Sequence, residues 1–193
     1  MTADEGTASD EMLASNARQG DRAAFEALVR RHKGSLYGWV RRYVGQPDDA
    51  YDIVQDAFIA VWESLHRYDL SRPFLPWLRT IALNKCRDFS RRQKFRRWLL
   101  QAYGAEAPLA VESMGPEDDE TRDAESECLR RLDRAIANLP VAYKEPLLLT
   151  TVGGLSQQEV AAALRTTTKA IEMRLRRARR KLADALVEPK GEG

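Results

Sequence analysis

The stretch from Leu155 to Leu182, LSQQEVAAALRTTTKAIEMRLRRARRKL, predicts two helices joined by a tight turn. Ser156 and Glu159 form a capping-box pattern, in which each residue satisfies a free backbone N–H at the start of a helix. The polar segment 165–168 then breaks the first helix and supplies a threonine as the N-cap of the second. Apolar residues recur in the second helix at the period of one buried stripe: Ile171, Leu175, Ala178 and Leu182.

The second of these helices is strongly basic on the faces that the stripe leaves free. Its basic residues there are Arg174, Arg176, Arg177, Arg179, Arg180 and Lys181. Two short helices at this spacing, the second one basic, are typical of a helix-turn-helix that lies in the major groove of DNA. The sequence therefore predicts a DNA-binding element, and the rest of the chain has to explain what is brought to that DNA.

Charge is distributed in three blocks, although the chain of 193 residues has a formal net charge of only +2. Residues 79–98 hold eight Lys or Arg against one Asp, and residues 169–181 hold seven against one Glu. Between them, residues 112–127 hold eight Asp or Glu against one Arg. Two positive blocks around a negative one predict two separate nucleic-acid contacts joined by a segment with another role.

The sequence offers little for catalysis, a disulfide or a metal site. Cys86 and Cys128 stand apart without a CxxC pattern, so both are predicted to be buried or half-buried thiols, and no metal or cofactor is expected. His32 and His66 are isolated and no glycine-rich phosphate loop is present, so an enzyme is not expected. No apolar run reaches the length of a membrane span and residues 1–10 are polar, so a cytoplasmic protein is predicted.

Nearly every periodic segment has the period of a helix, so the predicted fold class is all-α. Helices are expected from about residue 22 to 43, after an Asp21 cap, from about 48 to 65, and from about 77 into the basic tract. A polar loop punctuated by prolines is expected at about 66–76.

Two small helical domains joined by a flexible acidic linker are expected from these segments. The predicted boundaries are 1–97 for the first domain, 98–125 for the linker and 126–193 for the second domain, which contains the helix-turn-helix. The linker is predicted because glycine, proline and acidic residues replace the helical pattern there. Each domain is small, so its margin of stability is thin and burial against a partner would add to it.

Two further motif regions precede the linker and the helix-turn-helix. The first reads DIVQDAF at 52–58 with Trp62 after it, and the second reads PWLRTIALN at 76–84 with Asp88 and Arg91-Arg92 after it. In this order they resemble the extracytoplasmic-function (group IV) sigma factors of the sigma-70 family, over nearly all of residues 10–187. The resemblance implies a subunit that binds core RNA polymerase, recognises the −35 and −10 promoter elements, and opens the DNA strands.

By this resemblance, the segment 49–63 docks on the clamp helices of the polymerase beta-prime subunit. Its polar contacts would be Asp52, Gln55 and Asp56, with Trp62 nearby. An acidic ridge on an amphipathic helix can pair with a basic coiled coil and fix its register. The alternative is that these residues are merely solvated positions on the outer face of a core helix.

The resemblance assigns the −10 element to the loop 68–76 and the helix after it. Unpaired bases are captured by stacking and by polar contacts, while basic residues hold the phosphates. Asn84 is the expected base reader, Trp77 is expected in the core rather than as a stacking surface, and Asp88 is either a partner of Asn84 or part of a local ion pair. The residues assigned to the −10 strand are Phe74, Leu75, Asn84, Lys85, Arg87, Arg91 and Arg92, with Arg96 as a further phosphate contact.

The resemblance assigns recognition of the −35 element to the basic helix. The residues assigned to it are Lys169, Glu172, Met173, Arg174, Arg176, Arg177 and Arg179. Arginine favours guanine, and glutamate can accept from cytosine; Arg174 and Arg179 are expected at phosphate or solvent. Two positions depart from what is common in the family: Arg165 stands where members often have a glycine in the turn, and Glu172 stands where they often have a basic residue. The second predicts either an atypical −35 preference or a glutamate that pairs with a neighbouring arginine.

The implied partners are core RNA polymerase, promoter DNA as duplex and as melted strand, and an anti-sigma factor. The acidic linker is either a solvated tether or a segment that threads the active-site and RNA-exit path of the polymerase and imitates RNA. The alternative function is a stand-alone helix-turn-helix regulator. That alternative leaves the 52–62 ridge, the second basic block and the linker without a role.

Overall fold

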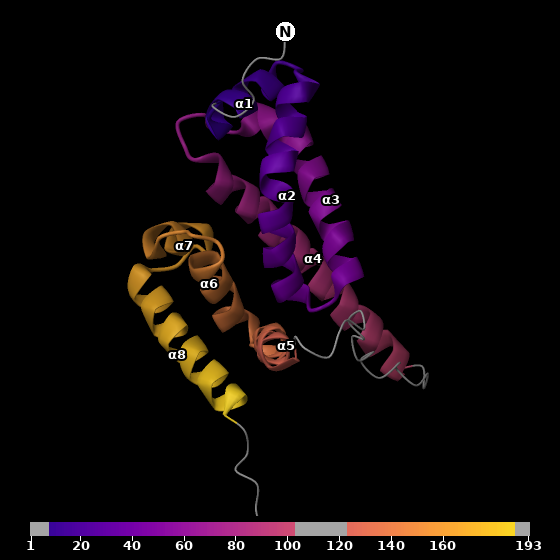
Figure 1. Cartoon of the computed structure of the whole chain (residues 1–193), viewed down its shortest axis with the longest axis vertical. Coiled ribbons are helices and arrows are strands. Elements are labelled where there is room, and N and C mark those ends of the chain that lie inside the picture. The colour runs from indigo at the N-terminus through magenta and orange to yellow at the C-terminus, as the bar shows by residue number, and fades with distance from the viewer. Residues whose placement is uncertain (1–7, 103–122, 188–193) are drawn as a thin grey trace, which may run out of the picture.

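The computed structural model describes residues 8–102 and 123–187, and the regular structure in these two ranges is entirely helical. This confirms the all-α class. The helices, drawn in Figure 1, are α1 (Asp10–Arg18), α2 (Arg22–Val44), α3 (Pro47–Ser64), the short 3₁₀ helix η1 (Leu65–Arg67), α4 (Phe74–Ala102), α5 (Asp123–Asn138), α6 (Val141–Thr151), α7 (Gln157–Ala163) and α8 (Thr168–Leu186).

The first four α-helices form one bundle, in which α2, α3 and α4 pack on one another and α1 lies across one end (Figure 1). Helix α2 begins where the Asp21 side chain accepts a hydrogen bond from the Ala24 backbone N–H, at 3.1 Å. It ends at Gly45, whose φ of 87° is the left-handed conformation that glycine adopts without strain. Both ends agree with the sequence prediction. Large side chains such as Trp39, Phe74 and Leu78 fill the core.

The last four helices form a second bundle, in which α8 packs on α5, α6 and α7. Leu148 and Leu149 of α6, Val160 of α7, and Ile171 and Leu175 of α8 are among its buried apolar side chains. Figure 1 shows α8, in yellow, running along the outside of this bundle. Its stripe of buried residues leaves the opposite side of α8 to solvent.

Several helix ends differ from the prediction. Helix α1 was not expected, and α4 begins at Phe74 rather than Trp77, so Phe74 and Leu75 are helical rather than loop residues. Helix α4 also continues to Ala102, past the predicted boundary at 97, because no glycine or proline interrupts residues 77–102. The domain boundaries remain a prediction, and residues 103–122 of the predicted linker lie outside the described ranges.

None of the helices in the described ranges combines the length and apolar character that crossing a bilayer requires.

Candidate nucleic-acid interface

Helix α8 presents its basic side chains because one stripe of the helix is buried. Ile171, Leu175 and Ala178 are buried against the other helices, and Leu182 is half-buried. The helix is capped by Thr167, whose Oγ1 accepts a hydrogen bond from the Ala170 backbone N–H at 3.2 Å, so the predicted threonine cap is confirmed. The side chains assigned to the −35 element that are exposed are Lys169, Glu172, Met173, Arg176, Arg177 and Arg179; Arg174 is half-buried.

The turn before α8 is held by a reciprocal cap on α7. The Ser156 backbone N–H donates to the Glu159 carboxylate at 2.8 Å, and the Glu159 N–H donates to Ser156 Oγ at 3.3 Å, which confirms the capping box. Hydrogen bonds from Ser156 hold the pKa of the Glu159 carboxyl below its usual value. Arg165 in the turn adopts a positive φ of 51°. The turn therefore contains a non-glycine residue in the left-handed conformation.

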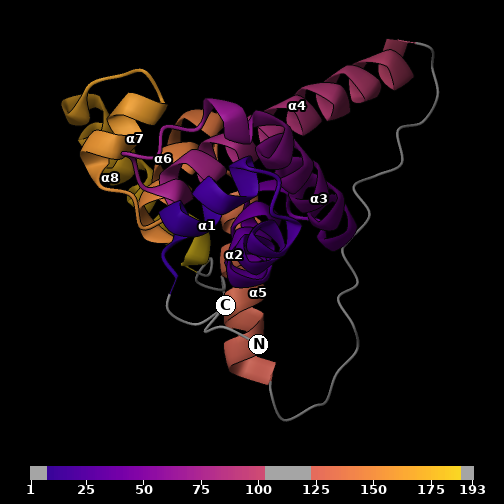
Figure 2. The same ribbon diagram turned by 90° about the horizontal axis from the view of Figure 1, so that it is seen from above.

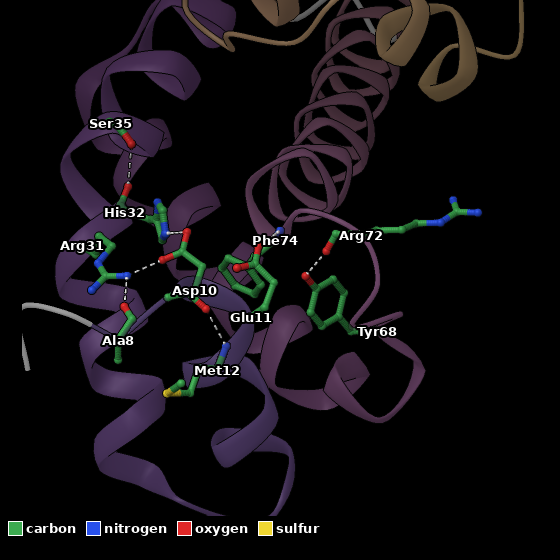
Figure 3. A network of polar contacts seen from close by, with 11 residues as sticks. Ala8, Asp10, Glu11, Met12, Arg31, His32, Ser35, Tyr68, Arg72 and Phe74 are labelled. Carbon is green, nitrogen blue, oxygen red and sulfur yellow. Dashed lines mark hydrogen bonds and ion pairs between the residues drawn. The ribbon is translucent and has the colours of Figure 1, made fainter.

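The start of α4 is anchored by an aromatic cluster and by α1. Phe74 has no exposed surface, and its ring lies 5.7 Å from those of both His32 and Tyr68. Its backbone N–H donates to Glu11 Oε1 of α1 at 3.3 Å (Figure 3). Trp77 packs half-buried on Tyr68, as its core prediction requires. The prediction of Phe74 as a loop residue that meets DNA therefore needs correction, since its ring is inside the core; Leu75 is half-buried.

Polar contacts seen in Figure 3 fix α1 on this cluster. Asp10 accepts from Arg31 Nη1 at 2.6 Å and lies 2.7 Å from His32 Nε2. Tyr68 donates its hydroxyl to the Arg72 carbonyl, and burial raises the pKa of Tyr68 to about 12. The aromatic cluster is thus linked to the loop 69–73 through Tyr68.

The middle of α4 carries most of the residues assigned to the −10 strand. Asn84, Arg91 and Arg92 are exposed, while Lys85 and Arg87 are half-buried. Asp88 pairs with Arg91 one turn along the helix, which decides between its two predicted roles in favour of a local ion pair. Cys86 lies on the opposite, buried face as a free thiol whose pKa is raised by burial. The side chain of Cys128 lies outside the described residues.

Arg87 is only partly exposed, and it binds Glu145 of α6. Its Nε and Nη2 donate to the two Glu145 carboxylate oxygens at 2.7 and 2.5 Å. Tyr43 of α2 donates its hydroxyl to the same carboxylate at 3.2 Å. Glu145 is nearly buried, and the hydrogen bonds with it raise the pKa of the Arg87 guanidinium. One carboxylate of the second bundle thus binds two side chains of the first.

Other contacts join the two bundles around this pair, and α2 packs on both α5 and α6. Lys144 Nζ donates to the Tyr43 carbonyl at 3.1 Å, and burial lowers the pKa of this amine. Arg79, also buried, donates to the Val152 carbonyl at 3.2 Å. Sequence reasoning missed this contact region, although two adjacent charged residues, Lys144 and Glu145, inside an apolar helix were a signal.

A cleft of about 440 Å³ lies between the bundles near the helix-turn-helix. Its lining residues are Thr80, Asn84 and Arg87 of α4 and Ala162, Ala163, Leu164 and Arg165 at the turn. The candidate base reader Asn84 therefore faces the turn of the helix-turn-helix in this arrangement.

The residues predicted to form an acidic ridge lie on the outer face of α3. Asp52, Gln55 and Asp56 are exposed, and Trp62 is 39% exposed with its ring centroid 4.9 Å from that of Phe25. Ile59, on the same face, is exposed as well and was not predicted. Its signal was an apolar residue off the buried stripe of Ile53, Ala57 and Val61. The ridge thus combines acidic, amide and apolar groups.

Comparisons with known proteins agree with this division into two bundles. The family Sigma-70 region 2 matches residues 28–96, which covers most of α2, α3 and α4. The family Sigma-70, region 4, matches residues 129–182, which covers the second bundle. The fold and these two family matches thus place the chain in the class of sigma factors.

Individual relatives match nearly the whole chain. RNA polymerase sigma factor NccH of Alcaligenes xylosoxydans xylosoxydans is 40% identical, over 92% of this chain and 94% of its own. The ECF RNA polymerase sigma-E factor of Escherichia coli (strain K12) is 30% identical, over 93% and 95%. The structure of CnrH in complex with the cytosolic domain of CnrY has a TM-score of 0.68 and 34% identity, over 92% and 96%. The chain belongs to the sigma-70 family, in its extracytoplasmic-function branch.

Proposed function

We propose that this chain is a promoter-specificity subunit of bacterial RNA polymerase, with no chemistry of its own. It binds core polymerase reversibly in the cytoplasm, recognises the −35 and −10 elements and supports strand opening. The observation that carries this proposal is the capped helix-turn-helix, whose α8 exposes a basic face beside a buried stripe. The acidic ridge of α3 and the basic helix α4 extend the proposal from DNA binding to transcription initiation.

Helix α8 enters the major groove at the −35 element. Lys169, Glu172 and Met173 stand in its first turns and reach base edges, with Arg176 and Arg177 one turn further along. Their exposure supports this role. Arg174 and Arg179 position the helix through phosphates, because such contacts fix register without reading sequence.

Helix α4 holds the −10 strand. Asn84 reads a base edge, and Lys85, Arg87, Arg91 and Arg92 bind phosphates. Leu75 contributes apolar surface at the start of the helix, whereas Phe74 supports this surface from inside. A phosphate contact by Arg87 competes with Glu145, because Nε and Nη2 of the guanidinium donate to that carboxylate.

The ridge of Asp52, Gln55, Asp56 and Trp62 docks on the clamp helices of the polymerase beta-prime subunit. Its exposed carboxylates fit basic partner residues, and Trp62 adds a buried anchor on docking. A stand-alone regulator would have no use for this ridge. An anti-sigma polypeptide is a further expected partner, by analogy with the relative CnrH, whose structure contains the cytosolic domain of CnrY.

The test is run-off transcription with bacterial core polymerase on a promoter library, with and without the chain. Transcripts that depend on the chain and share a −35/−10 pair are expected. A gel-filtration run of the chain with core polymerase accompanies it. Failure to co-elute, together with an absence of specific transcripts, would contradict the proposal and favour the stand-alone regulator.

A further inference from the structure

The last turns of α4 expose two aromatic rings that the proposed function has not used. Phe95 is 63% exposed and Trp98 is 60% exposed. Their ring centroids lie 5.9 Å apart, and the planes are inclined by 30°, which is a stacked arrangement. Exposing two large rings to water is unfavourable unless a partner covers them.

The two rings continue a single stripe of α4. Asn84, Asp88, Arg91, Phe95 and Trp98 follow one another at alternating steps of four and three residues, so they share one face of the helix. At about 1.5 Å per residue, Trp98 lies roughly 21 Å along the helix from Asn84. The candidate base reader and the two rings thus mark the ends of one track.

Positive charge surrounds the rings. Arg91, Arg92, Lys94 and Arg96 are exposed, and residues 89–102 contain no acidic side chain. Aromatic rings set among cations suit a single-stranded nucleic acid, whose bases stack while its phosphates pair with the cations. A duplex fits less well, because its bases already stack on each other and present no free face.

We propose that Phe95 and Trp98 form a stacking platform for unpaired bases, which extends the −10 strand site along α4. The inference rests on the proposed function in one respect, namely that α4 holds the melted strand. Figure 2 shows this end of α4 projecting away from α5, α6, α7 and α8, so the described helices of the second bundle leave it accessible. Trp98 also lies beyond the region 2 match, which ends at residue 96.

The experiment measures binding of the full-length chain to a dye-labelled, mixed-sequence single strand of about 16 nucleotides, by fluorescence anisotropy. The paired substitution Phe95→Leu/Trp98→Leu keeps apolar surface but removes both rings. It is expected to lower affinity roughly tenfold or more. The pair Phe95→Tyr/Trp98→Phe keeps two rings and is expected to bind like the original chain. Met12→Ala, at an exposed apolar site on α1, serves as the control and is expected to change nothing.

Crosslinking identifies the place of contact. A strand that carries bromouracil is expected to crosslink to the peptide that contains Phe95 and Trp98. Crosslinks confined to α8 would overturn the inference, and so would an unchanged affinity of the leucine pair.

A docking surface for protein gives a different pattern. The leucine pair would then bind the single strand normally, and Phe95→Ala/Trp98→Ala would lose co-elution with core polymerase. That outcome also overturns the inference. Because the binding assay contains no polymerase, failure of the stacking platform is distinct from failure of run-off transcription by the original chain, which would contradict the proposed function itself.

Discussion

The backbone of Arg165 is strained, because this residue adopts a conformation that favours glycine. Its φ of 51° places a β-carbon in the left-handed region, which costs roughly 1–2 kcal/mol. Arg165→Gly removes that cost but adds flexibility to the unfolded chain, so a net gain in unfolding free energy of about 0.5–1 kcal/mol is expected. Thermal unfolding followed by far-ultraviolet circular dichroism measures it.

Arg165→Ala is the matched control, because it removes the charge and keeps the β-carbon. Its unfolding temperature is expected to stay near that of the original chain. An equal rise in both variants would mean that charge, rather than backbone strain, limits stability at the turn.

Glu159 makes the stability of the helix-turn-helix depend on pH. Its pKa is below its ordinary value of 4.5, because the carboxylate accepts hydrogen bonds from Ser156. The unfolded chain therefore takes up this proton at higher pH than the folded chain, and stability present above about pH 4.5 is lost as the pH falls through the folded pKa. The carboxylate is exposed, so the contribution is expected to be below about 1 kcal/mol.

Urea unfolding of the original chain and of Glu159→Gln, at neutral pH and at a pH below 4.5, measures this contribution. The glutamine keeps an acceptor oxygen but cannot titrate. The original chain is expected to lose more stability on acidification than the variant. An identical loss in both would show that the cap does not depend on the charge.

At the scale of elements, the proposed role of α8 distinguishes residues that contact bases from residues that contact phosphates. Arg177→Ala is expected to weaken binding to a −35 duplex by about 1–3 kcal/mol and to relax preference at one base pair. Arg179→Ala is expected to weaken binding to all sequences alike and to reduce the salt slope by about one. Binding titrations at several salt concentrations distinguish the two. A uniform loss for Arg177→Ala would reassign that residue to a phosphate.

The exposed ridge of α3 predicts a charge effect on polymerase binding. Asp56→Arg places a cation where a carboxylate faces solvent, so the fold is expected to persist while affinity for core polymerase falls. Glu26→Arg makes the same change at an exposed site on α2 and serves as the control. Titration of labelled core polymerase measures both. Equal affinities for the two variants would contradict the docking role of the ridge.

Helices whose caps and buried stripes involve residues close in sequence could be predicted. Helices that depend on contacts with residues far away in sequence could not. The caps at Asp21, Ser156 and Thr167 and the stripe of α8 involve neighbours within a few residues, so sequence alone shows them. Helix α1 was missed because its buried face is small and Asp10 is fixed by α2, through Arg31 and His32.

The candidate surfaces divide in the same way. Exposure of the α8 and α3 residues follows from helical period, and the sequence indicated it. The burial of Phe74 could not be predicted, since it depends on rings from His32 and Tyr68 that lie on other elements. Likewise, no local pattern relates Arg87 to Glu145, which is 58 residues away along the chain.

On the scale of the whole molecule, Glu145 connects the two bundles. Glu145→Ala removes the acceptor shared by Arg87 and Tyr43 and leaves the Tyr43 hydroxyl without this partner. Because Glu145 is nearly buried while Arg87 is partly solvated, a loss of about 1–3 kcal/mol in unfolding free energy is expected. Small-angle scattering is expected to show a larger radius of gyration, since α6 loses contacts with α2 and α4.

Asp133→Ala is the control, because it removes a more exposed ion pair between the same bundles, Asp133 with Arg42 at 3.1 Å. Its expected cost is at most about 1 kcal/mol, without a change in dimensions. The pair with Glu145 also competes with the −10 role proposed for Arg87, so Glu145→Ala is expected to bind a single strand more tightly than Asp133→Ala. Equal strand affinities and equal dimensions for the two variants would mean that Glu145 neither joins the bundles nor withholds Arg87 from DNA.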